Sequence, residues 1–307
     1  MNFHKLILKE LSDLKNDNTS GANEFIDKTI RLLESQLKLI SNPNQDIKDL
    51  MLKLSREIIN SRPSMAPLIN TIGYIISDLH SYTKYEINKR IENFHQLRSK
   101  IELNLEKVFQ NFITTRSTLK AKIMLISYSS TIIKLLKKNQ NRNLIIYILE
   151  SRPLLEGQLV AEILSSSFET HLIIDAAMGK FIEEIDFVLV GIDSVLKDGS
   201  IVNKIGTYPL ACIANENKKQ VFGVGDSFKY NLKSHFNNRI SIETKPSEEV
   251  YDKKIKNELL QIHNYYFDIT PPQFISGIIS DLGLLTPQEF LKEIKDVLPL
   301  DWYKEFI

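Results

Sequence analysis

The sequence has a single cysteine, no long apolar run and almost no net charge. Cys212 is alone among 307 residues, which excludes an internal disulfide framework and a zinc site built from cysteines. The longest apolar runs reach about six residues, far short of the roughly 20 that a transmembrane helix needs. Because 39 lysines and arginines face 38 aspartates and glutamates, no strong field favours a nucleic acid or a membrane surface as partner.

Several signatures of cofactor and metal sites are also missing. No Gly-x-Gly-x-x-Gly sequence follows the first predicted strand, so the usual dinucleotide fingerprint is absent. The six histidines are scattered and none occurs in a His-Glu-x-x-His spacing. We therefore expect neither a metal nor a bound cofactor. The first residues carry no apolar signal core, so we expect a cytoplasmic protein.

Residues 1–118 are predicted to form a helical N-terminal subdomain. Apolar residues recur there every three or four positions, as in the stripe Ile26, Ile30, Leu33, Leu37 and Ile40. This spacing is typical of amphipathic helices whose apolar face is buried in a core. Breaks with Pro, Gly or Asn separate four shorter stripes, and a longer fifth stripe runs from Ile87 to Phe112.

The pattern changes in residues 119–307, where short Ile- and Val-rich runs alternate with helix-length segments. This alternation indicates βαβ units and a doubly wound, mainly parallel sheet, so the fold class is α/β. The runs cover residues 122–126, 143–148, 171–174, 187–190 and 221–224. The predicted helices between them cover residues 131–138, 155–164, 177–184 and 208–217.

Polar residues follow several of these predicted strands. Neighbouring strand ends meet in a doubly wound sheet, so these residues predict a ligand crevice. An acid, an amide, an ammonium and the start of a helix are groups that can bind the phosphate and the hydroxyls of a sugar phosphate. The predicted helix start is Gly206-Thr207, with Thr207 as its cap. The alternative is a set of ordinary charged loops and helix caps. The candidate residues are Ser127, Ser129, Ser130, Arg152, Asp193, Asn203 and Lys204.

The last part of the chain carries signals for turns and for helix caps. Residues 233–256 are polar and are predicted to form a long excursion. Asn264–Pro272 is predicted to be a stiff turn because paired prolines disfavour helix before them, and residues 273–281 are predicted to form a helix. Thr286-Pro-Gln-Glu289 predicts a further helix that opens with a capping box.

Six motifs in this order resemble one protein family. They are Glu150-Ser-Arg-Pro, Asp175-Ala-Ala, Gly191-Ile-Asp193, Asn203-Lys-Ile-Gly-Thr207, Ser227-Phe-Lys-Tyr230 and Tyr266-Phe-Asp-Ile-Thr-Pro-Pro272. From about Ser20 to Pro287 the chain resembles the alpha, beta and delta regulatory subunits of translation initiation factor 2B. The same superfamily includes ribose-1,5-bisphosphate isomerase and methylthioribose-1-phosphate isomerase.

The resemblance implies a Rossmann-like C-terminal domain, pairing into dimers or higher oligomers, and a pocket for a sugar phosphate or nucleotide. It implies that Asp193 matches the aspartate of the isomerase motif and that Asn203 and Lys204 match its substrate-binding pair. Arg62 lies in Ser61–Pro67, which also matches a family motif. It is expected to reach the pocket, or else to face solvent in a helix-breaking turn.

Two positions depart from the isomerase pattern. Ser127 stands where the isomerases carry a catalytic cysteine, and a serine hydroxyl is a far weaker acid than a thiol unless a base assists it. Ser20-Gly21 stands where they carry an Arg-Gly pair that grips phosphate. Cys212 does not replace the thiol, because it falls inside a predicted helix as a buried structural residue.

These departures favour a non-catalytic regulatory subunit that binds a phosphorylated sugar or nucleoside monophosphate. Such a subunit is expected to self-associate and to contact an initiation factor 2 subunit. The alternative is an aldose–ketose isomerase of nucleotide salvage, in which Asp193 and Ser127 would be the catalytic residues. A scaffold with an inactive pocket is the third possibility.

Overall fold

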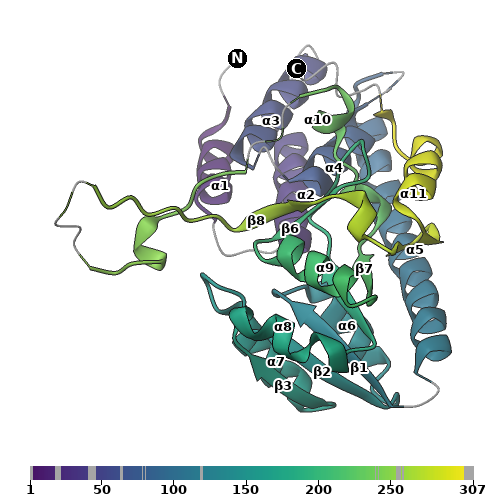
Figure 1. Cartoon of the computed structure of the whole chain (residues 1–307). Coiled ribbons are helices and arrows are strands. Elements are labelled where there is room, and N and C mark those ends of the chain that lie inside the picture. Colours follow the sequence, from purple (N-terminus) through teal and green to yellow (C-terminus); the bar gives the residue numbers. More distant parts are fainter. Residues whose placement is uncertain are drawn as a thin grey trace.

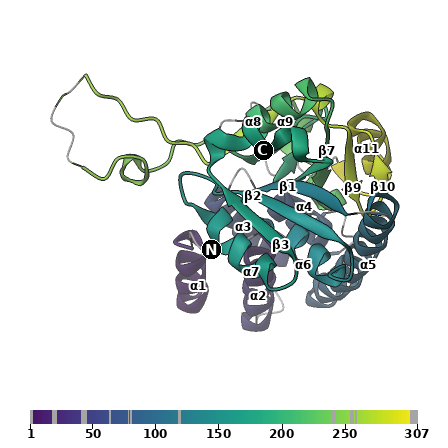
Figure 2. The same cartoon turned by 60° about the horizontal axis from the view of Figure 1, so that its bottom comes forward.

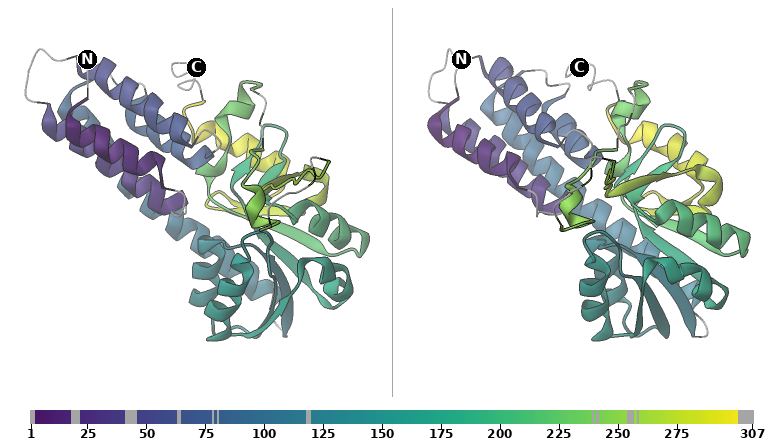
Figure 3. Two further views of the ribbon diagram at one scale, coloured as in Figure 1. Left: turned by 90° about the vertical axis from the view of Figure 1, so that its left-hand side faces the viewer. Right: turned by 60° about the vertical axis from the view of Figure 1, so that its left-hand side comes forward.

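The computed structural model describes residues 3–17, 22–40, 46–62, 65–77, 79, 81–117, 120–238, 240, 242–253, 257 and 259–300. A group of helices comes first, and a region built on a seven-stranded sheet follows it (Figure 1). Side views place the helical group on one side of the sheet region (Figure 3). The predicted α/β class, with helices preceding a mainly parallel sheet, is confirmed.

The N-terminal helices follow the apolar stripes of the sequence. In α1, for example, Ile7, Leu11 and Leu14 are buried. Side chains cap several of these helices: Thr83 Oγ1 accepts a hydrogen bond of 3.2 Å from the backbone N–H of Glu86 at the start of the longest one. Within the described residues the helices are α1 (Lys5–Lys15), α2 (Ala22–Leu39), α3 (Ile47–Ser61), α4 (Ala66–Ile76) and α5 (Lys84–Arg116).

The seven-stranded sheet has the order β10-β9-β7-β4-β1-β2-β3. All neighbouring strands are parallel except β10, which runs antiparallel to β9. The central strands are apolar on both faces because helices cover both, as a parallel sheet requires. The strands are β1 (Ala121–Ile126), β2 (Leu144–Leu149), β3 (Glu169–Ile173), β4 (Phe187–Gly191), β7 (Gln220–Val224), β9 (Gly277–Ser280) and β10 (Gly283–Leu285).

Helices α6 and α7 and the second half of α5 cover one face of this sheet, and α8 and α9 cover the other (Figure 2). The predicted strands of residues 122–224 and the predicted helices 131–138, 155–164 and 208–217 are confirmed to within about two residues, the usual uncertainty of element ends. The predicted helix 177–184 is only partly correct, because four residues of α-helix lie there between two 3-10 turns. The helices are α6 (Ser130–Lys138), α7 (Glu156–Ser165), α8 (Met178–Phe181), α9 (Thr207–Glu216), α10 (Leu232–His235) and α11 (Pro287–Glu293). Short 3-10 turns are η1 (Asp175–Ala177), η2 (Ile182–Glu184), η3 (Ser227–Lys229), η4 (Ser247–Glu249), η5 (Pro272–Phe274) and η6 (Ile294–Asp296).

Two expectations for the C-terminal part are wrong. Residues 273–281 are not a helix but contain η5 and strand β9, in which the β-branched Ile278 and Ile279 are fully buried beside β7. The expected turn at Asn264–Pro272 contains strand β8 (Phe267–Thr270). This strand completes a small antiparallel sheet with β5 (Ser194–Val195) and β6 (Ile201–Lys204). The predicted capping box of α11 is confirmed.

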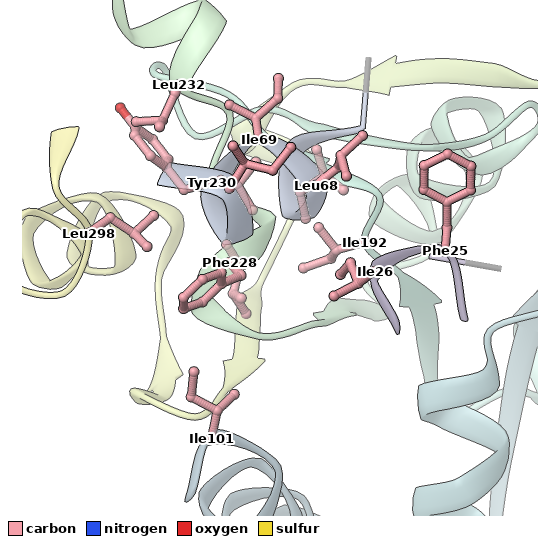
Figure 4. Packing of buried hydrophobic residues seen from close by; sticks show 14 of the residues in the cluster. Phe25, Ile26, Leu68, Ile69, Ile101, Ile192, Phe228, Tyr230, Leu232 and Leu298 are labelled. Atoms are coloured by element: carbon pink, nitrogen blue, oxygen red, sulfur yellow. The ribbon is translucent and has the colours of Figure 1, made fainter. Parts of the chain in front are cut away.

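One apolar cluster joins the helical group to the sheet region (Figure 4). Helical residues such as Ile26 and Leu68 belong to the same buried cluster as Ile192, Phe228 and Tyr230. Ile192 directly precedes Asp193, so this packing positions a predicted site residue. Cys212 lies in α9 as predicted, but it is only half-buried.

A long arm leaves the body between α10 and β8. Its described residues are 242–253, 257 and 259–266, and they extend well beyond the rest of the chain (Figure 1). The regular structure of its described residues consists of an antiparallel β-bridge between Thr244 and Tyr265 and the short turn η4. The predicted excursion of residues 233–256 is therefore confirmed for residues 242–253, whereas its first three residues belong to α10 and residues 254–256 lie outside the described ranges. None of the described helices is both long and apolar enough to cross a membrane.

Candidate functional site

The strand order creates a crevice at the carboxyl ends of β1 and β4. The chain passes from β1 to β2 and β3 on one side, and then places β4 on the other side of β1. Ligands of open α/β sheets bind at such a switch point. Ser127 follows the last residue of β1, and Asp193 lies two residues beyond the end of β4. Two predicted site residues thus lie at the switch point.

Ser127, Glu156 and Lys204 form one polar network there. The Ser127 hydroxyl donates a 2.9 Å hydrogen bond to Glu156 Oε1, and the Lys204 ammonium lies 2.7 Å from the same oxygen. Only 7% of the Lys204 side chain is exposed, so the carboxylate balances a charge that has lost most of its water. Within the described structure, Glu156 Oε2 is buried without a hydrogen-bond partner. Glu156 therefore keeps one acceptor available.

Local backbone geometry brings Ser127 and Glu156 together. Ser127 has a left-handed backbone conformation (φ 68°), and its N–H donates to Ser151 Oγ at 2.8 Å. A Cβ added to Gly157 would lie 1.9 Å from the carbonyl oxygen of Leu149, so a glycine is required for α7 to begin so close to the end of β2. This approach brings Glu156, the first residue of α7, within reach of Ser127.

Asp193 is a half-buried carboxyl beside this network. Burial raises its pKa, Lys229 and Lys204 act in the opposite direction, and Glu156 adds to the rise. The backbone N–H of Asp193 donates to the carbonyl oxygen of Val202 at 3.0 Å, which ties the residue to β6. A carboxyl with a raised pKa can exchange a proton with a ligand more readily near neutral pH than an ordinary aspartate.

Asn203 and Ser129 meet at Gly191, the last residue of β4. A Cβ at Gly191 would lie 3.2 Å from Ser129 Oγ and 3.4 Å from Asn203 Oδ1. Asn203 Nδ2 donates to Thr207 Oγ1 at 3.0 Å, and Ser129 Oγ accepts from the backbone N–H of Ile132 at 3.3 Å as the cap of α6. Both predicted residues are thus gathered at the switch point and held by hydrogen bonds.

Ser130, the first residue of α6, lines a cavity of about 260 Å³ between α2, α5, α6 and the segment after β7. The three cations in its lining are paired with carboxylates: Lys134 with Glu102, Lys138 with Glu106 and Arg98 with Asp27. Because these charges balance, the cavity does not favour an anion by its charge.

A carboxylate already occupies the backbone amides at the start of α9. Asp268 Oδ2 accepts hydrogen bonds from the N–H groups of Gly206 at 2.8 Å and Tyr208 at 3.1 Å. Burial raises the pKa of Asp268 to about 6, and the hydrogen bonds from the amides limit the rise. These amides are therefore not free for a phosphate, contrary to the sequence-based expectation. The cap is Gly206 rather than Thr207, whose hydroxyl donates to the carbonyl oxygen of Lys204.

Arg152 lies at the edge of the site and contacts the arm. Its side chain is exposed, and its guanidinium donates to the carbonyl oxygen of Glu249 at 3.2 Å. Its backbone N–H and that of Ser151 donate to the two carboxylate oxygens of Asp175, at 2.7 and 2.8 Å. The carboxylate of Asp175, a residue of one of the family motifs, thus fixes the backbone of the loop after β2.

Arg62 is engaged within the helical group. Its guanidinium lies over the ring of Phe25, 4.2 Å from the centroid, and donates to the carbonyl oxygen of Asp17. Burial lowers its pKa, while Asp17 and Glu243 of the arm act in the opposite direction. A role of Arg62 in the pocket stays a prediction. Ser20 and Gly21 lie outside the described residues.

Sequence reasoning missed three residues of the site: Glu156, Lys229 and Tyr266. The Lys204 ammonium lies 4.9 Å from the centroid of the Tyr266 ring, an attractive cation–π contact. Lys229 belongs to η3 and acts electrostatically on Asp193. Glu156 had one usable signal, since it directly precedes a glycine at a predicted strand-to-helix turn.

The arrangement offers hydrogen-bond acceptors for hydroxyl groups and an ammonium for an anion. Asp193 and Glu156 supply the acceptors, Lys204 supplies the cation, and Asn203 and Ser129 can both donate and accept. Across the described ranges no group of three or more His, Cys, Asp or Glu residues could hold a metal.

Comparison with known proteins agrees with this architecture. A profile described as the initiation factor 2 subunit family matches residues 18–287. Over 288 residues the chain is 30% identical to the ribose 1,5-bisphosphate isomerase of Methanocaldococcus jannaschii, covering 92% of either protein. It is also 30% identical to a putative translation initiation factor eIF-2B subunit 2-like protein of Pyrococcus furiosus, covering 92% of this chain and 96% of that protein.

Solved structures share the fold. The translation initiation factor eIF-2B of Pyrococcus horikoshii superposes with a TM-score of 0.75 at 24% identity, covering 93% of this chain and 98% of that one. A chain of the tetrameric eIF2B-beta2-delta2 complex of C. thermophilum gives a TM-score of 0.68 at 15% identity, covering 94% and 93%. Related structures therefore include oligomeric complexes. With its profile match over most of the sequence, this chain belongs to the initiation factor 2 subunit family, which includes both initiation factor 2B-like proteins and sugar-phosphate isomerases.

Proposed function

We propose that this chain is a self-associating, non-catalytic regulatory subunit that binds a phosphorylated sugar or nucleoside monophosphate at the switch point. The network of Ser127, Glu156 and Lys204 carries this proposal. A ligand hydroxyl would donate to Asp193 or to the free Glu156 Oε2, and a phosphate would accept from Lys204. Ser129, Ser130, Asn203, Arg152 and Arg62 complete the proposed set of ligand-binding residues.

The state of Ser127 supports the non-catalytic assignment. Its hydroxyl is hydrogen-bonded to a carboxylate that already balances the Lys204 ammonium. A carboxylate in an ion pair is a weak base toward an alcohol, so the hydroxyl is held but not activated. Ser127 would then orient a ligand rather than exchange a proton with it.

A regulatory role in assembly is in line with the names of several relatives, which are initiation factor 2B-like subunits. In this role the bound metabolite would modulate self-association and contact with an initiation factor 2 subunit. The chain would act in the cytoplasm, as expected from its sequence.

Thermal-shift and calorimetric titrations test the binding. Ribose 1,5-bisphosphate, ribose 5-phosphate and AMP are compared with free ribose. Free ligand at about 100 times its Kd should add about 2.7 kcal/mol of stability. Asp193→Asn and Lys204→Ala should both abolish this stabilisation. Lys180→Ala, an exposed lysine of α8, serves as the control and should leave it unchanged. If no phosphorylated compound stabilises the wild type, the pocket is inactive and the proposal fails.

A second function, aldose–ketose isomerisation, is favoured by the raised pKa of Asp193. In this function the bond between C1 and the ring oxygen of the sugar phosphate would break while Asp193 moves a proton from C2 to C1. Ser127, with Glu156 as its acceptor, would pass the proton of the 2-hydroxyl to the former ring oxygen, which leaves a ketone at C2, so the reaction is balanced within one substrate. The isomerase relative at 30% identity supports this reading.

Conversion of ribose 1,5-bisphosphate, followed by NMR, distinguishes the two functions. An isomerase would form the ketose bisphosphate, and the Asp193→Asn variant would lose this conversion. We expect binding without detectable conversion. Conversion by the wild type that disappears in the Asp193→Asn variant would overturn the non-catalytic assignment and leave the binding site intact.

A further inference from the structure

The described residues of the arm carry apolar side chains that remain exposed. Leu259 is 90% exposed, and Leu260 and Val250 are each 45% exposed. The figures show the arm extending away from both the helices and the sheet (Figure 1, Figure 2). An extended segment loses conformational entropy without gaining burial unless another surface covers it.

A second uncovered apolar surface lies at the β3 edge of the sheet. We call Leu154, Leu159, Leu172 and Ile174 the edge patch. Leu172 and Ile174 are 48% and 58% exposed, and β3 is hydrogen-bonded to a described strand only through β2. Leu172 is in register with Ile148, whose side chain is part of the cluster under α6 and α7. Leu172 and Ile174 therefore face the same side of the sheet as α7, which carries Leu159.

The arm and the edge patch lie on one flank of the molecule. The guanidinium of Arg152, in the loop just before α7, donates to the carbonyl oxygen of Glu249 in the arm. Figure 2 shows the arm leaving the body beside the carboxyl ends of β2 and β3. Parallel sheet edges and large apolar protrusions are rarely left in water. Each copy of the chain thus presents an arm with exposed aliphatic side chains and an exposed aliphatic surface at the β3 edge.

We propose that the arm of one copy packs on the edge patch of a second copy, and reciprocally, in a two-fold symmetric dimer. An isologous interface needs two complementary surfaces on each subunit, arranged so that both contacts form at once. The arm and the patch meet this condition with the same chemistry, aliphatic side chains on aliphatic side chains. The proposal rests on the self-association within the proposed function and names the surfaces that produce it.

The same dimer would connect assembly to the ligand site. The hydroxyl of Tyr266, at the root of the arm, donates to Glu249 Oε1, and the Tyr266 ring lies beside the Lys204 ammonium. Asn264 Nδ2 donates to Glu249 Oε2 at 2.8 Å, which further fixes this root. An arm held by a partner would hold the Tyr266 ring against Lys204, so dimerisation and ligand binding would strengthen each other.

Crosslinking between two single-cysteine proteins tests the contact directly. In a Cys212→Ser background, one protein carries Leu259→Cys and the other Ile174→Cys. A short bismaleimide should link them only when the two are mixed. Leu103→Cys, on an equally exposed leucine of α5, replaces Ile174→Cys in the control and should give no link to the arm. A mixture that links no better than this control would overturn the proposal.

Mass measurement separates this proposal from self-association as such. The wild type should sediment at twice the chain mass of 35.4 kDa. Both Leu259→Asp with Leu260→Asp and Leu172→Glu with Ile174→Glu should reduce it to the single-chain mass, whereas Leu103→Glu should not. All substituted side chains are exposed, so the fold is expected to survive, and circular dichroism checks it. A dimer that persists in both variants would overturn the arm contact while leaving self-association intact. A wild type that is monomeric at all concentrations would overturn both, and ligand titration would then test the pocket alone.

Discussion

The Ser127 hydroxyl donates its hydrogen bond to Glu156 across the end of the sheet, from the turn after β1 to the first residue of α7. Since the two residues are 29 positions apart in sequence, only the parallel pairing of β1 and β2 brings them together. This contact decides how Ser127 can act. It holds the hydroxyl in one direction, toward a carboxylate whose charge Lys204 already balances.

Replacing Ser127 by cysteine should change the chemistry of the site more than its stability. A thiol with an ordinary pKa near 8.5 can exchange a proton near neutral pH, unlike a hydroxyl that is merely held. We expect Ser127→Cys to convert ribose 1,5-bisphosphate at least about tenfold faster than the wild type, measured by NMR. Ser127→Ala is the matched control. A Ser127→Cys variant no faster than Ser127→Ala would show that the serine is not what limits turnover.

A double-mutant cycle on Glu156 and Lys204 should reveal a strong coupling. Removing one partner of a buried pair leaves a charge without compensation, so we expect Glu156→Gln and Lys204→Met to be coupled by about 2 to 3 kcal/mol in chemical unfolding. The exposed pair of Lys120 and Glu169, with about half of each side chain in solvent, is the control and should show less than about 1 kcal/mol. Equal couplings in the two pairs would contradict the buried character of the site.

The sequence predicted the switch point well because its signals are local. An apolar run that stops at Gly191 and is followed by Asp193 predicts a strand end, and the parallel sheet then brings that end beside Ser127. No strand was predicted at Asn203 and Lys204. They lie instead in β6, whose pairing with β8 joins residues more than 60 positions apart.

The remaining errors arise where contacts distant in sequence decide the outcome. Residues 273–281 were predicted to be a helix, but residues 277–280 pair with β7 as a parallel strand. From the sequence alone the backbone amides at the start of α9 are expected to be available for a phosphate. In the structure they donate to the carboxylate of Asp268 in β8. Glu156 was overlooked because nothing in its own segment indicates that Lys204 will lie beside it.

Asp268 should make the protein less stable as the pH rises through mildly acidic values. Its folded-state pKa of about 6 lies above the ordinary value of 3.8, so between these values the folded protein binds a proton that the unfolded chain has released. The free energy of unfolding should therefore fall between about pH 4 and pH 6, by up to about 2 kcal/mol from this group.

Asp268→Asn should reduce this pH dependence while keeping an acceptor for the amides of α9. Urea unfolding at several pH values measures the effect, with the exposed Asp252→Asn as control. Asp281, whose pKa burial also raises to about 6, should leave part of the slope in place. An unchanged slope in the Asp268→Asn variant would contradict the assignment.

Asn70 should be a strong link between the helical group and the site. Its Nδ2 donates to the carbonyl oxygens of Phe228 and Tyr230, at 2.6 and 2.7 Å, and its side chain is buried. Asn70→Ala leaves both carbonyl groups buried and unpaired, which should cost about 3 kcal/mol in the free energy of unfolding. Asn70→Asp should cost more at pH 7, because it sets a carboxylate against two carbonyl oxygens.

The control is the exposed Asn111→Ala, which should stay within about 0.5 kcal/mol of the wild type. Asn70→Ala should also weaken binding of the phosphorylated ligand, because η3 carries Lys229, which acts electrostatically on Asp193. Full affinity in this variant would show that the hydrogen bonds of Asn70 do not position the site.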